Sequence, residues 1–370
     1  MPLLLNPSAA EPLPSHLLGH LKFRQPVVFM ALLVTLLLAG VTTLSGCGSG
    51  GSSTFSDNFP PVVQPPTSIP NTPPVVLPAV GERIAANVAF DQTRFAEGVS
   101  VDPSNGTLYL GTSGDSVFAL LRSAPLASTF TGWLSATGIL PGAPASGTLV
   151  AGTRVQGGLI YFCASTLAPV GKVWAFNLAT QAKTGEYALP SGFCNDLAFD
   201  TAGNLFATTN RITVGAEAIV KLSAASVASG TSTATDWATW YTPPAGFDMN
   251  GLTFDAAGNR LIWADNTTTP RGTSRFNASP TSPSAASVTV LFNSLAVDVD
   301  GLQITRAGNL LAIDQVTGAK LISLGTGIAG NVSSLTGGAA CATTVALYRS
   351  DAWCSDSRGL VLRLAGAGNL

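Results

Sequence analysis

Charged side chains are scarce in this chain of 370 residues, which has 18 Lys and Arg and 20 Asp and Glu, or 10% of all positions. Soluble domains ordinarily have about 25%. Low charge together with 46% hydrophobic residues excludes an intrinsically disordered chain, which needs high charge and few apolar residues. A nucleic-acid partner is also excluded, because a formal net charge of −2 supplies no basic surface for phosphates.

Histidine is almost absent, and its two copies, His16 and His20, both precede residue 21. The apolar run from Val27 to Val41 has 15 residues. A membrane span needs ~20, so the run indicates the core of a signal peptide. We therefore expect an exported chain without histidine. This excludes Ser-His-Asp triads and histidine-ligated zinc, haem or copper sites.

A cysteine follows the apolar run closely. The segment Leu44-Ser45-Gly46-Cys47 resembles the lipobox of bacterial lipoproteins, in which the cysteine is acylated and becomes the first residue after cleavage. This resemblance implies a lipoprotein signal peptide over residues 1–46 and a lipid on Cys47. A plain secretory signal or an uncleaved anchor is the alternative.

The next stretch is poor in residues that could form a core. Residues 48–53 are all Gly or Ser, and eight prolines fall between Pro60 and Pro78. Such segments form flexible and polyproline-type spacers rather than sheets. We expect a disordered tether over residues 47–78 and one folded domain over residues 79–370. The lipid would anchor the protein to a membrane, at the periplasmic face or the cell surface, on the outer membrane if the source is Gram-negative.

Four cysteines remain in the expected folded domain, and none forms a CxxC pair. They are Cys163, Cys194, Cys341 and Cys354. An even number in an exported chain is typical of disulfides. Three connectivities are possible. The short separation across one expected hairpin favours Cys341–Cys354, which leaves Cys163–Cys194 as the second bond.

A repeat runs through the folded part. Each strong unit has a short alternating strand, a turn rich in Asp, Gly and Asn, and a second apolar strand, which is typical of a β-hairpin. The strong units begin at Glu97, Asn195, Asn250 and Asp300, and two weaker units begin around Thr148 and Thr344. No long stretch has a helical period.

Six units over residues 79–370 have about 49 residues each, near the ~40–50 residues of a propeller blade. The sequence therefore predicts an all-β fold, a six-bladed β-propeller. A strand from about Arg83 to Phe90 is expected to join the last blade and close the ring.

The first residue of each strong unit, its lead residue, carries a side-chain oxygen. Blades are related by rotation, so the four lead residues are expected to converge on the axis. Two carboxylates and two amides are hard ligands. They predict one divalent cation bound by Glu97, Asn195, Asn250 and Asp300, with calcium expected first and magnesium, manganese or zinc as alternatives. The competing interpretation is that these residues cap strands or fill turns.

The strong units resemble the six-bladed propeller family of senescence marker protein, gluconolactonase and luciferin-regenerating enzyme. The matching motifs are Glu97-Gly98, Asn195-Asp196, Asn250-Gly251 and Asp300-Gly301, in the family's order. The third motif departs from the family's Asn-Asp-Gly because Leu197 stands in place of the glycine. The arginine expected near that motif to contact a sugar acid is not evident.

The resemblance implies a metal-dependent hydrolase of the lactonase type. Its four lead residues would bind the cation, and Asp300 would also be the general base for the water that opens a lactone or another ester. We expect a monomer that acts on a small molecule. The rival interpretation is a non-catalytic, surface-tethered propeller that binds a protein or a glycan, with a structural or empty metal site.

Overall fold

The computed structural model describes residues 83–88, 96–114, 118–124, 129–135, 148–165, 171–210, 217–268, 271–324, 332–335, 338, 341–355 and 360–370. The expected signal peptide over residues 1–46, the lipidation site at Cys47 and the tether over residues 47–78 lie outside the described residues. Within them, no helix combines the length and the apolar character that a membrane crossing requires.

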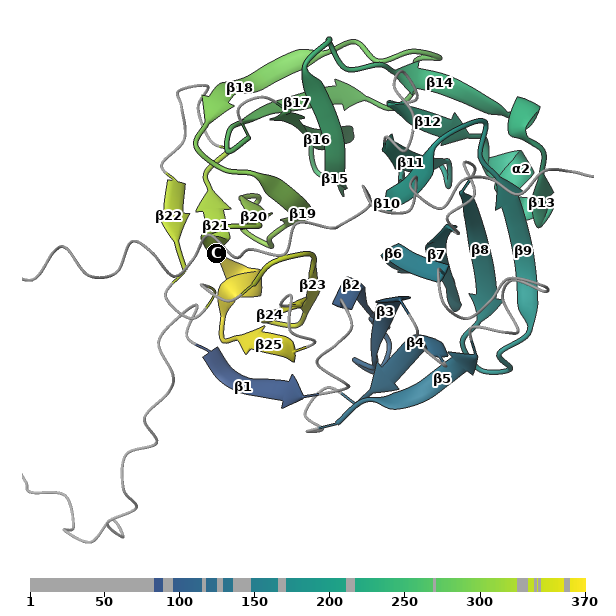
Figure 1. The fold of residues 1–370 in the computed structure, drawn as a ribbon, viewed down its shortest axis with the longest axis horizontal. Coiled ribbons are helices and arrows are strands. Elements are labelled where there is room, and N and C mark those ends of the chain that lie inside the picture. The colour runs from purple at the N-terminus through teal and green to yellow at the C-terminus, as the bar shows by residue number, and fades with distance from the viewer. Residues whose placement is uncertain are drawn as a thin grey trace, which may run out of the picture. The chain divides into compact units, whose positions relative to one another are not determined.

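The described strands form six antiparallel blades around one axis, which confirms the predicted propeller (Figure 1). Blade 1 contains β2 (Ala96–Val101), β3 (Leu108–Gly114), β4 (Phe118–Ser123) and β5 (Thr131–Ser135). Blade 2 contains β6 (Thr148–Gln156), β7 (Leu159–Ser165), β8 (Lys172–Asn177) and β9 (Lys183–Ala188). Blade 3 contains β10 (Phe193–Phe199), β11 (Leu205–Asn210), β12 (Ala218–Leu222) and β14 (Trp237–Tyr241).

The remaining three blades follow the same order from the axis outward. Blade 4 contains β15 (Phe247–Asp255), β16 (Arg260–Thr267), β17 (Ser274–Pro280) and β18 (Thr289–Leu295). Blade 5 contains β19 (Val299–Ile304), β20 (Leu310–Asp314), β21 (Gly318–Ile322) and β22 (Val332–Ser334). Blade 6 contains β23 (Val345–Tyr348), β24 (Asp351–Ser355), β25 (Leu360–Leu364) and β1 (Arg83–Val88).

Helices are nearly absent from the described residues, as predicted. A short helix, α2 (Ala224–Ala228), and a 3-10 turn, η3 (Ala234–Asp236), interrupt blade 3. Between them, β13 (Thr231–Ser232) runs parallel to β9 of blade 2. A second 3-10 turn, η6 (Ala367–Asn369), ends the chain.

The ring is closed by the first strand of the domain. β1 pairs antiparallel with β25, from Arg83 opposite Leu364 to Val88 opposite Leu360. Blade 6 therefore contains strands from both ends of the domain, and the predicted closure is confirmed. Figure 1 shows β1 on the outer side of β25.

Successive side chains of a strand point to opposite faces of the sheet, so each blade packs against both of its neighbours. In β20, Leu310 and Ala312 contact blade 4, whereas Leu311 and Ile313 contact blade 6. A strand that is buried on both faces must be apolar at every position. Buried apolar clusters of this kind occupy all six interfaces between neighbouring blades in the described part of the chain. The six tryptophans are buried, as packing between blades requires.

In blades 1, 3, 4 and 5, the turn after the inner strand is held by the residue five positions beyond the lead residue. Asp102 accepts hydrogen bonds from Ser104, and Asp200 accepts them from the backbone of Ala202. Carboxylates in such positions replace the backbone partners that a tight turn leaves unpaired. In blade 5 a hydroxyl has this role, because Thr305 Oγ1 accepts from the Asn309 amide at 3.1 Å.

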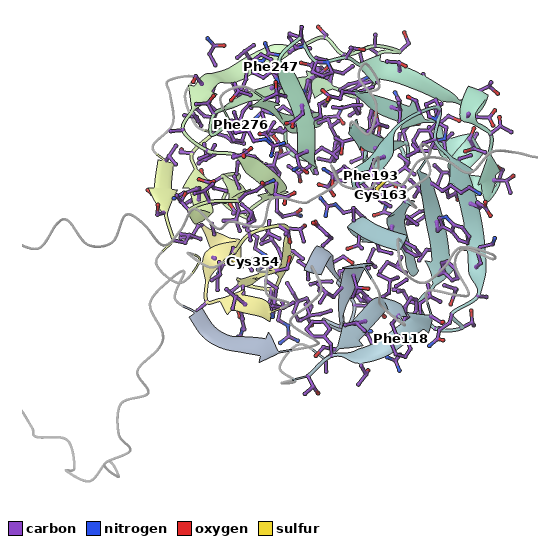
Figure 2. The ribbon with its side chains drawn as sticks, in the orientation of Figure 1. Phe118, Cys163, Phe193, Phe247, Phe276 and Cys354 are labelled. Carbon is purple, nitrogen blue, oxygen red and sulfur yellow. A yellow bond between two sulfur atoms is a disulfide. The ribbon has the colours of Figure 1, made fainter. Side chains whose placement is uncertain are left out.

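The structure contains two disulfides, Cys163–Cys194 and Cys341–Cys354, and Figure 2 labels one cysteine of each. The first joins β7 of blade 2 to β10, the innermost strand of blade 3. The second joins β24 to the segment before β23 within blade 6. Disulfides are typical of chains that fold in an oxidising compartment.

Candidate metal centre at the propeller axis

The inner strands share one irregularity at the position of the lead residue. Their pairing shifts between Glu97 and Val99 in blade 1 and between Met249 and Leu252 in blade 4. Blades 2, 3 and 5 have the same shift at the corresponding place. A bulge leaves one residue out of the ladder and changes the direction of its side chain. The lead residues therefore depart from their sheets at one level of the propeller.

In blades 1, 4 and 5, glycine follows the lead residue because the inner strands converge there. A Cβ on Gly98 would collide with the carbonyl oxygen of Ala151, and one on Gly301 would lie 2.8 Å from that of Thr343. Real Cβ atoms do not approach other atoms so closely, so only glycine fits. These contacts also identify Ala151 and Thr343 as the lead positions of blades 2 and 6, close to the expected Thr148 and Thr344.

The structure brings the four oxygen-bearing lead residues together. Asn195 Nδ2 donates a hydrogen bond to Asn250 Oδ1, and the Asn250 side chain donates to Asp300. The charges of Glu97 and Asp300 interact directly. All four residues retain some accessible surface, whereas the residues next to them are mostly buried.

No positively charged side chain among the described residues pairs with either of the two carboxylates, Glu97 and Asp300. Burial, and then the charge of Asp196, raise the pKa of Glu97 to about 7. The pKa of Asp300 lies well above its usual range because of burial, followed by the charges of Glu97, Asp196 and Asp298. Negative charge held in this way is stabilised by a proton or by a cation. The donor set therefore fits a hard divalent ion.

Amides are essential to this donor set. Among the described residues, no group of three or more His, Cys, Asp or Glu side chains is arranged to hold a metal ion. The axial group contains two carboxylates from Glu97 and Asp300, and the other two donors are the oxygens of Asn195 and Asn250. Any ion bound here would depend on both asparagines.

Asp196, the second residue of the Asn195-Asp196 motif, pairs beside this group with Arg154, which the sequence did not single out. Arg154 Nη2 lies 3.4 Å from Asp196 Oδ2 and 3.1 Å from the carbonyl oxygen of Leu252. Asp196 also accepts hydrogen bonds from the amides of Leu197 and Leu252, at 2.8 and 3.1 Å. This pair joins blades 2, 3 and 4. Its arginine comes from the preceding blade, 42 positions away, where no local motif marks it.

The two weaker blades contribute no carboxylate or amide to the axis. The lead position of blade 2 is Ala151, and in blade 6 the hydroxyl of Thr343 forms a hydrogen bond with Ser355. Among the described residues, the carboxylate and amide donors therefore come from four blades, and the other two present small side chains. The three cavities described in the structure lie away from this group.

No protein-family model matches the chain, and no curated protein matches it in sequence. Solved structures do resemble it. A gluconolactonase from Xanthomonas campestris has a TM-score of 0.52 at 15% identity, over 77% of this chain and 91% of that one. A protein described as a candidate gluconolactonase has a TM-score of 0.55 at 12% identity, over 78% and 93%.

A virginiamycin B lyase from Staphylococcus aureus is similar to the same degree. Its TM-score is 0.51 at 12% identity, over 76% of this chain and 98% of that one. Identities this low establish the fold alone, because propellers support many unrelated activities. Gluconolactonase-like propellers are thus among the structural neighbours, and the function has to be argued from the site.

Proposed function

We propose that the chain is a divalent-cation-dependent hydrolase of the lactonase type. The observation that carries this proposal is the convergence of Glu97, Asn195, Asn250 and Asp300 from four different blades at the axis. These side chains would hold one cation, with calcium first and magnesium, manganese or zinc as alternatives. When bound, such a cation polarises an ester carbonyl and lowers the pKa of water.

The protein's own residues would accept the proton, orient the general base and leave room for the substrate. Asp300 is partly accessible at the axis, so its carboxylate can accept the proton of an attacking water. Asn250, which bridges Asn195 and Asp300, would fix the direction of that carboxylate. The small lead residues of blades 2 and 6 would leave room for the substrate, a small lactone or another ester.

The proposal also covers the location of the protein in the cell and its oligomeric state. The two disulfides support an oxidising compartment. We propose an exported, monomeric lipoprotein that is anchored through Cys47, with the spacer over residues 47–78 between the lipid and the propeller.

The test combines metal analysis with a panel of lactones. The purified protein should contain a divalent cation and hydrolyse at least one lactone, and removal of the cation with EDTA should abolish turnover. Asp300→Ala should abolish hydrolysis while the far-ultraviolet circular dichroism stays unchanged. Glu186→Gln, which alters a carboxylate that is bonded to Lys172 and Lys183 in blade 2, is the matched control and should retain activity. Full turnover by Asp300→Ala would falsify the catalytic assignment.

One observation favours the rival, a non-catalytic binding propeller. Asn195 and Asn250 bond to each other, so part of the donor set is satisfied without an ion. In that case the protein would bind no cation, or would bind one without hydrolysing any lactone. Metal analysis together with the activity panel separates these outcomes.

A further inference from the structure

One of the three cavities lies at the end of the inner strands that is opposite to the candidate metal centre. Its volume is about 400 Å³, and its lining includes Arg306, Leu347, Tyr348, Arg349 and Gly368. Arg306 stands six positions after Asp300, which corresponds to about 20 Å along an extended strand. This cavity is therefore separate from the candidate metal centre.

Two arginines that line the cavity form no ion pair with the described residues. The structure describes the side chains of eight arginines, and five of them form ion pairs. The other three are Arg122, Arg306 and Arg349, and two of these three line this cavity. Both are exposed, and neither guanidinium forms a hydrogen bond or an ion pair with the described part of the chain.

Nearby carboxylates are already engaged. Asp351 is paired with Arg363 and accepts a hydrogen bond from the Gly366 amide at 2.8 Å. Asp102 accepts from Ser104 and Asn105. Arg363 neutralises Asp351, whereas Asp102 accepts only from neutral donors and keeps its charge. The two arginines therefore outnumber the one nearby carboxylate that has no ion pair among the described residues.

The backbone holds both arginines in place. The Arg306 amide donates to the carbonyl oxygen of Gly368 at 2.9 Å, which fixes the turn of blade 5 against the C-terminal segment. Arg349 has a φ of 55°, a left-handed conformation that an ordinary side chain adopts only at some cost. Its guanidinium carbon lies 5.1 Å from the centre of the Tyr348 ring. The tight turn between β23 and β24 requires this left-handed conformation, because Tyr348 pairs with Asp351 and leaves two residues in the turn.

We propose that this cavity binds a phosphate monoester of a small organic molecule. A phosphate monoester carries about −1.5 to −2 charges at neutral pH and three acceptor oxygens. Two guanidinium groups match both its charge and its acceptors, whereas a monocarboxylate is satisfied by one. Tyr348 and Leu347 supply an apolar surface for the organic part, and the volume accommodates a single ring.

Calorimetric titration of the purified full chain with phenyl phosphate tests the proposal. Saturable binding with one site is expected, and benzoate should bind more weakly because it has one charge. Arg306→Gln and Arg349→Gln should each weaken binding by about tenfold or more, as expected for hydrogen bonds to charged groups. Arg122→Gln is the matched control: it removes an exposed, unpaired arginine from a different cavity, and the affinity should stay unchanged.

The experiment is independent of the metal centre, so it is repeated in EDTA, where the affinity should be the same. The proposal is overturned if the native chain shows no saturable binding. It is also overturned if neither arginine variant differs from the native chain, or if Arg122→Gln loses as much affinity as they do. Thermal unfolding checks that all three variants are folded.

Discussion

Glu97 carries an electrostatic penalty at the axis. It forms no ion pair with the described residues, and its pKa is raised to about 7 by burial and by Asp196. The folded protein therefore favours the protonated side chain. Because the ordinary pKa is 4.5, this contribution to stability is fully present below pH 4.5 and is lost as the pH rises through about 7.

We predict that the cation-free protein is less stable at pH 8 than at pH 5, with Glu97 contributing up to about 3 kcal/mol of the difference. Glu97→Gln should reduce this dependence, because an amide does not ionise. Calcium should raise the melting temperature of the native protein more at pH 8 than at pH 5. Thermal unfolding in EDTA and in calcium measures both effects. Equal calcium shifts at the two pH values would contradict the prediction.

At the scale of elements, the disulfide Cys163–Cys194 fixes an inner strand. Both sulfurs are fully buried, and Cys194 directly precedes the lead residue of blade 3. The Cys194 amide also donates to Ser165 Oγ at 3.3 Å. The bond therefore ties the bulge that presents Asn195 to the neighbouring blade. Neither Cys341 nor Cys354 is next in sequence to one of the four candidate cation ligands.

We predict that Cys163→Ser/Cys194→Ser destabilises the protein and weakens cation binding. The two disulfides close loops of 31 and 13 residues. Loop closure gives about 3 to 4 kcal/mol for the first and about 3 kcal/mol for the second. Cys341→Ser/Cys354→Ser is thus a matched control, with a similar loss of stability and an unchanged cation affinity. Calorimetry with calcium distinguishes them, and equal affinities in both variants would refute the positioning role.

The inner-strand hairpins were predictable where the turn chemistry was local. Asp200 and the glycine after it mark the blade 3 turn within a few residues of Asn195. Ala151 was missed because it has no side-chain oxygen, and its hairpin turns through Gly157 and Gly158 without the aspartate. Arg154 could not be predicted, because its contact with Asp196 depends on how two blades pack. Whether an ion binds at the axis depends on the sub-ångström placement of four side chains, which no sequence motif encodes.

At the scale of the whole molecule, closure of the propeller ring depends on the single strand β1. β1 is the fourth strand of blade 6, and its backbone pairs with β25 over its full length. Without it, β25 would be an exposed edge, which is prone to pair with other chains.

We predict that deletion of residues 83–88 causes aggregation and lowers the melting temperature. Deletion of six residues between Pro60 and Pro78 is the control and should leave both properties unchanged, because that stretch is expected to be a spacer. Thermal unfolding and size-exclusion chromatography measure the result. A monomeric, equally stable chain after loss of β1 would show that closure is dispensable.

The pairing of β1 with β25 also has a consequence for how the protein folds. Val88 pairs with Leu360, 272 positions later. Hairpins within each blade can form while the chain is still emerging, but β1 has no partner until β25 is available. Joining ends this far apart costs about 5 kcal/mol of chain entropy, against about 2 kcal/mol for a ten-residue loop. Ring closure is therefore a late step in folding, and a chain truncated at its C-terminus would leave β1 without a partner.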